Sequence, residues 1–385
     1  MSMSASSPHD GMKPLRILVL GGYGFFGARL VARLARRPGL HLTVAGRSAA
    51  RGRALAARLH AQGPSEVHAT VLDVSGPDLL AHLRAHSPDV VIHACGPFQG
   101  QPYHVARASI ELGAHYIDLA DGRAFVTGIR ELDATARAAG VAVISGASSV
   151  PALSCAAADH LSRDLGRVES IDIGISPGHR TERGLSTVQA ILSCCGHPLP
   201  AHKGPDTHAW IGHWQQTYPA PVGQRLLSPC DVPDLDLLGP RYPGTPAVRF
   251  GGGLELRLLH RSLNLMARLV RLGLIRDWSV HAKALKWLSD LTNALGSDSG
   301  AMHVTVAGRT ADGQPKTRTW FLVAEDGDGP HVPTLAAAAL IRKLQAGTGL
   351  PIGAQPCIGL LTLDDFRAET DGLKINLFET EATDA

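Results

Sequence analysis

The first 150 residues alternate short apolar runs with longer segments in which apolar residues recur at helical spacing. The short runs have the length and β-branched content of strands, and a helical segment follows nearly every one. Because parallel strands joined by single helices form right-handed crossovers, the pattern predicts a doubly wound, largely parallel sheet. The expected strands are residues 16–20, 40–45, 67–73, 90–94, 115–119 and 141–145. The expected helices are residues 28–37, 51–60, 77–86, 103–112 and 125–139.

The pattern changes after Pro151. We expect helices at residues 152–163 and 187–195, a strand at 168–175, and a helical region at 254–295. Two more strands, 302–308 and 317–324, should pair across a turn at Asp312-Gly313, and a last helix should cover 334–346. A chain of 385 residues exceeds one compact core. The fold class is therefore α/β, with a Rossmann domain followed by a second α/β or α+β domain.

The composition is that of an ordinary globular protein, with 44% apolar and 18% charged residues. A net charge of +3 without a basic tract argues against a nucleic-acid partner. The six cysteines show neither a disulfide framework nor metal-ligand spacing, so we expect a cytoplasmic protein without a metal. Residues 1–13 are expected to form a disordered tail.

A glycine loop follows the first predicted strand directly and leads into a helix. Its spacing is Gly22-x-Gly24-x-x-Gly27, with Phe25 and Phe26 at the helix start. The first glycine permits the tight turn, the second lets the backbone approach a pyrophosphate, and the third allows close helix–strand packing. The anion would then lie on the helix N-terminus, so the loop predicts a dinucleotide site.

The cofactor preference depends on the residue about twenty positions after this loop, where NAD-binding folds place a carboxylate. Here that residue is Arg47, followed by Ser48. A guanidinium binds a 2′-phosphate in bidentate fashion, so we predict NADP(H), with Ser48 as an extra donor. Arg51 either assists or is a solvated helix residue. Asp73, at the end of the third strand, either lies near the adenine or is a turn residue.

The fourth strand ends in Cys95-Gly96-Pro97-Phe98, which should flank the nicotinamide. Cys95 either touches the nicotinamide carboxamide or is a small packed residue. With the glycine loop, the Ala-Gly-Arg motif at 45–47 and the segment Ala-His-Tyr-Ile-Asp at 114–118, this sequence resembles the saccharopine dehydrogenase family. The resemblance is strongest over residues 15–155 and loose over 196–300.

The resemblance implies a Rossmann domain at 14–150 and a substrate and dimerisation domain at 151–330. It further implies that residues 331–385 return to the Rossmann domain, that the chain is a homodimer, and that it acts on a small molecule by pyridine-nucleotide redox chemistry, typically at a C–N bond. One departure concerns the substrate. Members that act on amino acids usually have an Asp-Pro-Gly turn where this chain has Ser-Ser-Val-Pro at 148–151. No set of arginines is evident for two or three carboxylates.

Four residues are candidates for proton transfer or substrate binding. Asp118 and Asp121 follow the fifth strand, where a carboxylate can exchange a proton, although Asp118 could equally cap a turn. His179 and Arg180 follow the first strand of the second domain. If they face the interdomain cleft, His179 would serve as a proton donor and Arg180 as a substrate anchor.

These features leave three hypotheses open. The first is an NADP(H)-dependent oxidoreductase that acts on a small imine, secondary amine or carbonyl. The alternative is a non-catalytic NADP(H)-binding sensor or scaffold. The third concerns the basic residues within 254–295, for which a solvated face is the default interpretation and contact with a membrane surface, subunit packing or a substrate lid are alternatives.

Overall fold

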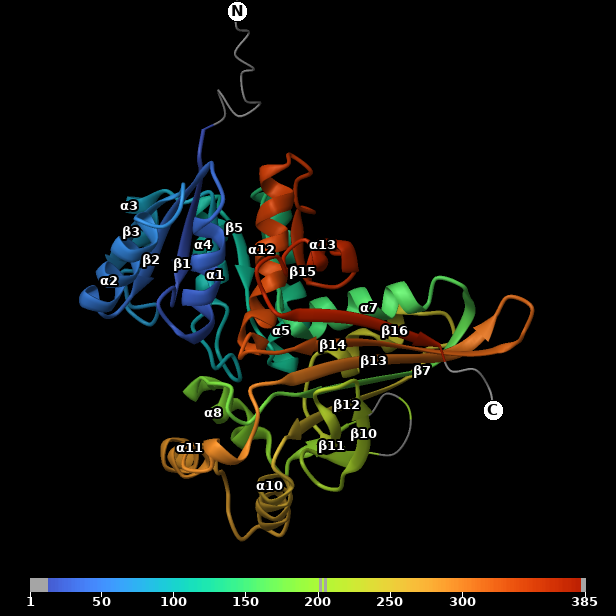
Figure 1. Ribbon diagram of the computed structural model, residues 1–385. Coiled ribbons are helices and arrows are strands. Elements are labelled where there is room, and N and C mark those ends of the chain that lie inside the picture. The colour runs from blue at the N-terminus through green and yellow to red at the C-terminus, as the bar shows by residue number, and fades with distance from the viewer. Residues whose placement is uncertain (1–12, 201–202, 204–205, 382–385) are drawn as a thin grey trace, which may run out of the picture.

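The computed structural model describes residues 13–200, 203 and 206–381, so the expected tail lies almost wholly outside the described residues. Two seven-stranded sheets, here named sheet A and sheet B, dominate the fold. In Figure 1 sheet A, with its helices, occupies the upper left and sheet B crosses the lower right. None of the helices described is long and apolar enough to cross a membrane.

Sheet A is entirely parallel and has the strand order β15-β6-β5-β4-β1-β2-β3. This arrangement confirms the predicted doubly wound Rossmann fold. Its strands are β1 (Leu15–Leu20), β2 (Leu40–Gly46), β3 (Glu66–Val71), β4 (Val90–His93), β5 (His115–Asp118), β6 (Ala142–Ser145) and β15 (Gly353–Pro356). Its connecting helices are α1 (Phe25–Ala35), α2 (Ala49–His60), α3 (Leu79–His86), α4 (His104–Leu112), α5 (Arg123–Gly128) and α6 (Asp133–Ala138).

The predicted helix at 125–139 is divided into α5, a 3-10 turn at Ile129–Leu132 and α6. The Tyr103 hydroxyl donates to the carbonyl of Phe125 at 2.7 Å. That carbonyl would otherwise accept from the amide four residues later. A Cβ on Gly128 would lie 2.6 Å from the same hydroxyl oxygen, so the close approach of Tyr103 coincides with the end of α5.

Sheet B is mixed and has the order β10-β11-β12-β7-β13-β14-β16, in which only β12 and β7 pair in parallel. The predicted hairpin at Asp312-Gly313 is confirmed by the antiparallel register of β13 and β14. The strands are β7 (Leu165–Ser176), β10 (Trp214–Tyr218), β11 (Gly223–Pro229), β12 (Ala247–Leu254), β13 (Gly300–Thr310), β14 (Pro315–Ala324) and β16 (Ile375–Glu381), with a separate pair β8 (Pro198–Leu199) and β9 (Thr207–His208).

The remaining helices are α7 (Ser154–Leu161), α8 (Leu185–Cys194), α9 (Asp234–Leu237), α10 (Arg257–Arg271), α11 (Ala282–Asp290), α12 (Val332–Gln345) and α13 (Leu363–Arg367). The helical region expected at 254–295 is thus two helices. Gly273, with φ +75°, follows the end of α10 and supplies the left-handed residue that commonly ends a helix.

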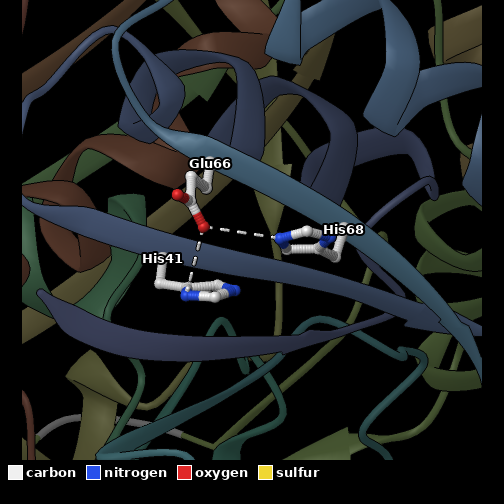
Figure 2. A group of neighbouring side chains, drawn as sticks. All are labelled: His41, Glu66 and His68. Carbon is white, nitrogen blue, oxygen red and sulfur yellow. Dashed lines mark ion pairs between the residues drawn. The ribbon is translucent and has the colours of Figure 1, made fainter.

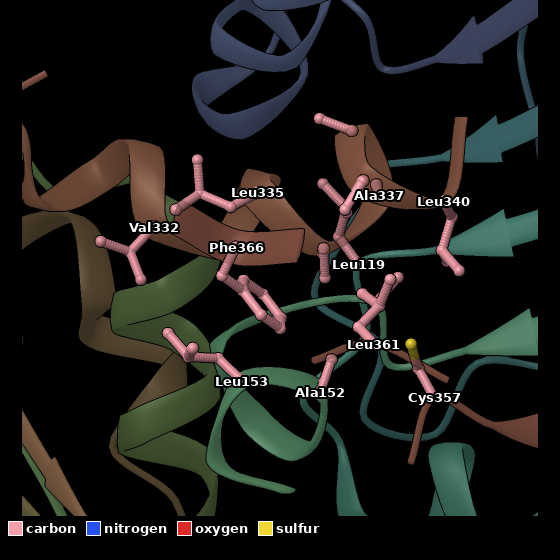
Figure 3. Packing of buried hydrophobic residues seen from close by; sticks show 14 of the residues in the cluster. Leu119, Ala152, Leu153, Val332, Leu335, Ala337, Leu340, Cys357, Leu361 and Phe366 are labelled. Atoms are coloured by element: carbon pink, nitrogen blue, oxygen red, sulfur yellow. The ribbon is translucent and has the colours of Figure 1, made fainter. Parts of the chain in front are cut away.

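The two sheets share one hydrophobic core around α12. This alanine-rich helix contacts α1 on one side and the segment that precedes α7 on the other. Figure 3 shows Leu335 of α12 close to Leu153 and Phe366, both of which are almost fully buried. Residues 331–381 are therefore shared between the layers, because β15 joins sheet A and β16 joins sheet B.

Candidate functional site: a dinucleotide cleft

A cleft of about 680 Å³ lies over the carboxyl ends of β1, β2, β3 and β4. A ligand in a doubly wound sheet binds at this edge. The lining residues come from five segments of the Rossmann layer and one of the second layer. They are Gly21, Tyr23, Gly24, Phe25, Gly46, Arg47, Leu72, Asp73, Val74, Ser75, Ala94, Cys95, Gly96, Gln101, Pro102, His104 and Ser186.

The glycine loop forms the floor of the cleft between β1 and α1. The amide of Gly24 donates to the carbonyl of Gly21 at 2.8 Å, which closes the turn. A Cβ on Gly22 would lie 2.9 Å from the Val19 carbonyl, and one on Gly24 would lie 2.9 Å from the Gly21 carbonyl. Both positions therefore require glycine. A Cβ on Gly27 would also collide with the Gly21 backbone.

The N-terminus of α1 can hold an anion. No side chain caps it, and its first turn contains no acidic residue. The amides of Phe25, Phe26 and Gly27 therefore retain their hydrogen-bonding capacity at the positive end of the helix dipole. The ring of Phe25 also lines the cleft, whereas Phe26 packs against the core. The loop therefore offers free amides and a helix N-terminus to a pyrophosphate.

Arg47 lines the cleft at the end of β2 and is exposed. Within the described chain it has no ion-pair partner, so its guanidinium is free to bind a phosphate. The hydroxyl of Ser48 accepts from the amide of Arg51 at 3.4 Å and caps α2, while the hydroxyl of Tyr23 accepts from the Ser48 amide. Arg51 lies over the ring of Tyr23, 5.0 Å from its centroid. These contacts brace the wall beside Arg47.

The opposite wall follows β3. Asp73 lines the cleft and also accepts from the amide of Ser75 at 3.0 Å. This is the turn-forming contact that the sequence analysis left open beside a cofactor role. His104 Nε2 lies 2.7 Å from the carbonyl oxygen of Val74 and holds the same segment from α4.

The segment after β4 forms the end of the cleft where the nicotinamide is expected. The side-chain amide of Gln101 donates to the carbonyls of Cys95 and Pro97, at 2.8 and 2.6 Å, and fixes the loop that exposes Gly96. Burial raises the pKa of the Cys95 thiol to about 12. The thiol is therefore neutral at neutral pH, and Cys95 both lines the cleft and packs against the core.

The second layer closes this end through α8. Ser186, in the first turn of α8, is the lining residue that comes from outside the Rossmann layer. A Cβ on Gly184, which precedes α8, would lie 3.3 Å from the Phe25 side chain, so the helix start touches the phosphate loop. The N-terminus of α8, like that of α1, has no side-chain cap and no acidic residue.

The two aspartates that follow β5 have different surroundings. Asp118 is fully buried and accepts from the amides of Gly146 and Ala120 and from the Ser145 hydroxyl, at 2.7, 3.0 and 3.0 Å. Burial nevertheless outweighs these hydrogen bonds and raises its pKa to about 6. These contacts tie the ends of β5 and β6 together and favour the turn-capping alternative for Asp118.

Asp121 is partly exposed and lies beside Gln99, whose amide nitrogen is 3.5 Å from its Oδ1. The negative charge of Asp121 helps to raise the pKa of the Cys230 thiol, and Cys230 belongs to the second layer. Burial raises the pKa of Asp121 above its ordinary value. Asp121 thus lies between the layers, near the loop that exposes Gly96.

His179 and Arg180 are not among the residues that line the cleft. His179 is buried, its Nε2 lies 2.8 Å from Thr292 Oγ1, and its pKa is lowered by burial and by the nearby Arg183. Arg180 donates to the carbonyl of Gly296 at 2.9 Å. Both side chains therefore hold the segment before β13, and a role in proton transfer or substrate binding has no support from these contacts.

A group with metal-ligand chemistry lies elsewhere, at the start of β2 and β3 (Figure 2). His41 Nδ1 and His68 Nε2 each lie 3.6 Å from Glu66 Oε2, and all three side chains are at least partly exposed. The cofactor cleft is at the other end of these strands. An ion bound by these residues would therefore take no direct part in chemistry at the cleft.

Comparison with known proteins agrees with this geometry. Residues 17–144 match the family model described as the saccharopine dehydrogenase NADP binding domain. The Rossmann layer is thus similar to the NADP-binding domain of that family. The matched domain binds NADP, so NADP(H) is the cofactor indicated for the Rossmann layer and an NADP-dependent oxidoreductase is the class of enzyme that the match supports. A search of curated proteins by sequence found no match.

Solved structures extend the likeness of fold beyond the Rossmann layer. Apo saccharopine dehydrogenase (L-Glu forming) of Saccharomyces cerevisiae superposes with a TM-score of 0.67 at 16% identity, covering 96% of this chain and 100% of that one. GenD2 of gentamicin A biosynthesis, in complex with NAD, gives a TM-score of 0.43 at 13% identity with full coverage of both chains. A short-chain dehydrogenase from Sphingobium yanoikuyae with NADPH gives 0.22 at 23% identity, covering 27% of this chain and 52% of that one.

The sequence analysis missed three residues that shape the cleft. Gln101 and Tyr23 brace loops through hydrogen bonds that leave no motif in the sequence. Ser186 enters from a helix about 160 residues after the glycine loop. An unusual glycine-capped helix start at Gly184, without acidic residues, is the one local signal that could have drawn attention to it.

Proposed function

We propose that this protein transfers a hydride between NADP(H) and a small imine, secondary amine or carbonyl at the end of the cleft between Gly96 and Ser186. One observation carries the proposal: the start of α8 reaches the phosphate loop and closes the cleft beside Gly96. The bound cofactor supplies the hydride. The chain supplies orientation, exclusion of water and a route for one proton.

In this proposal Asp121 moves the proton. Its partly exposed carboxylate lies beside Gln99 of the loop that exposes Gly96, and its raised pKa favours proton exchange nearer neutrality. The Ser186 hydroxyl and the free amides at the start of α8 would orient the substrate nitrogen or oxygen. Asp118 would act only by positioning the loops that carry Asp121.

The charges around the cleft narrow the substrate class. Arg47 is the only guanidinium among the described lining residues, and the cofactor phosphate would occupy it. Arg123, which follows Asp121 closely, pairs with Asp236 and Asp231. A substrate with several carboxylates would therefore lack counter-charges, which supports a substrate less anionic than saccharopine. We also propose a homodimer, as the family resemblance implies.

A non-catalytic NADP(H) sensor is the competing proposal, favoured by the lining residues next to Gly96 along the described chain, Ala94 and Cys95, of which the second has a thiol pKa raised by burial. The enzyme proposal and the sensor proposal differ in whether bound NADPH is oxidised. The oxidation of NADPH should be followed with panels of cyclic imines, imines formed from aldehydes and amines, and ketones. The enzyme proposal expects consumption of NADPH with at least one panel. Tight NADPH binding without turnover on any panel would contradict the enzyme proposal and support the sensor proposal.

A further inference from the structure

The helix α10 presents a row of leucines to solvent. Leu258, Leu265 and Leu272 are 77%, 58% and 72% exposed. Their spacing of seven residues places them on one side of the helix, with Leu272 at its C-terminal cap. This row lies outside the buried side of α10, so the helix carries apolar side chains on a solvent-facing side as well.

The buried side of α10 is instead partly polar and well anchored. His260 Nε2 lies 2.8 Å from the hydroxyl of Ser228, and the amide of Asn264 donates to the same oxygen at 2.9 Å. Leu263 and Ala267 pack beside them against α8 and its neighbours. These contacts fix the rotation of the helix, so the exposed leucines are a property of the folded structure.

The apolar surface continues along the chain through α11. Trp287 is 65% exposed, and Leu288, Leu291 and Leu295 follow at helical spacing. Of the twelve large apolar side chains exposed in the described residues, nine lie between Leu258 and Leu295. Such a concentration marks an interaction site. We name residues 257–295 the α10–α11 face; in Figure 1 both helices lie at the lower edge, on the far side of α8 from sheet A.

The charge of the α10–α11 face is strongly positive. Residues 257–295 contain seven Lys and Arg and two Asp, a net charge of +5 in a chain whose total is +3. Both acids are engaged locally, because Asp277 accepts from Ser279 at 2.7 Å and Asp290 pairs with Lys286 at 2.6 Å. Arg261 and Arg268 lie beside the leucine row and have no ion-pair partner within the described chain.

The charge decides between two occupants of this face. A second copy packed across a two-fold axis would bring the same arginines together around the same leucines, and this repulsion would oppose the apolar contact. A bilayer that contains anionic lipids complements both features. The apolar row enters the headgroup boundary while the arginines bind lipid phosphates, and an exposed tryptophan suits that boundary.

We propose that the α10–α11 face docks on an anionic lipid surface. Since α11 packs against α8, and α8 lines the cofactor cleft through Ser186, docking would bring the substrate end of the cleft close to the bilayer. The proposal does not rest on the proposed reaction, because it concerns the exposed face alone.

The test is co-sedimentation of the full chain with vesicles of phosphatidylcholine, with and without phosphatidylglycerol. Wild type should sediment with the anionic vesicles, and less so in high salt. Replacing the row by Leu258→Gln, Leu265→Gln and Leu272→Gln together should lower the partition coefficient at least about tenfold. Arg261→Gln with Arg268→Gln should lower it about tenfold on anionic vesicles only.

Phe378→Gln is the matched control, since Phe378 is 41% exposed on the edge strand β16, outside the face. It should sediment as wild type does, and NADPH affinity should show that each variant is folded. Wild type left in the supernatant, or a triple leucine variant that sediments unchanged, would overturn the proposal. The proposal would also be overturned if wild type did not bind vesicles but self-associated in solution, and the triple leucine variant lost that self-association.

Discussion

The two ends of the cofactor cleft are built in different ways. The phosphate end comes from one continuous stretch of chain, in which β1, the glycine loop and the start of α1 form the anion site without outside help. The substrate end brings together the segments after β4 and β5 and the start of α8, which are distant in sequence. The cofactor end is therefore recognisable as a motif, whereas the substrate end depends on how the layers pack.

The largest effect should follow from filling the phosphate end. In Gly24→Val a branched side chain would start 2.9 Å from the Gly21 carbonyl and displace the loop from the pyrophosphate. We expect NADPH affinity to fall about a thousandfold, or ~4 kcal/mol, by fluorescence titration. Gly329→Ala is the control, since a Cβ there meets nothing within 4 Å. Retained affinity in Gly24→Val would place the cofactor elsewhere.

Next in size is a pH effect at the loops that support the substrate end. The pKa of Asp118 is raised from 3.8 to about 6 in the folded protein. The folded state then binds the proton more tightly, so this group lowers the free energy of unfolding as pH rises from about 4 to about 6. The total loss is about 3 kcal/mol.

Asp118→Asn should remove this loss, because asparagine does not titrate, and its amide oxygen can still accept from Gly146 and Ala120. Urea unfolding at pH 4 and pH 7 checks the difference between variant and wild type. The same pH dependence in both proteins would mean that Asp118 does not titrate in this range.

A smaller effect is expected from the proposed proton carrier. Asp121→Asn should lower kcat about a hundredfold, or ~2.7 kcal/mol, with little change in NADPH affinity. Asp121→Glu should recover part of the activity and shift the pH profile of kcat. If Asp121→Asn keeps full activity, the proton moves through another group.

The smallest effect concerns cofactor choice. Arg47→Ala should weaken NADPH binding about tenfold to thirtyfold and leave NADH binding nearly unchanged, because only the 2′-phosphate needs the guanidinium. Arg53→Ala, an exposed arginine on α2 outside the cleft lining, is the control. If Arg47→Ala lowered the affinity for both coenzymes equally, Arg47 would not be the residue that binds the 2′-phosphate.

The same contrast explains what could be predicted from the sequence. The parallel sheet, the hairpin at Gly313 and the steric need for glycine at positions 22 and 24 follow from local periodicity and sterics, and the structure agrees. The position of Ser186 follows from tertiary packing, and only the helix start at Gly184 marks it in the sequence. His179 follows the end of a strand, where a cleft residue was expected. Its ring nevertheless lies beside Thr292, and His179 is not among the residues that line the cleft.

The helix α10 shows a further limit of pattern reasoning. Its leucines and arginines predict an amphipathic helix with a solvated basic face and a buried leucine face. In the structure Leu263 is buried, beside His260 and Asn264, which bond to Ser228, whereas Leu258, Leu265 and Leu272 are exposed. The leucines therefore lie on two sides of the helix, and the pattern alone does not tell which of them are buried.

The central claim is that the substrate end of this cleft performs hydride transfer. Its most direct test is a single turnover with NADPH that carries deuterium on the nicotinamide C4, followed by mass spectrometry of the product from an imine or carbonyl panel. The account predicts one deuterium on the reduced carbon, and loss of that label with Gly24→Val. Saturating NADPH binding with no labelled product from any panel would contradict it.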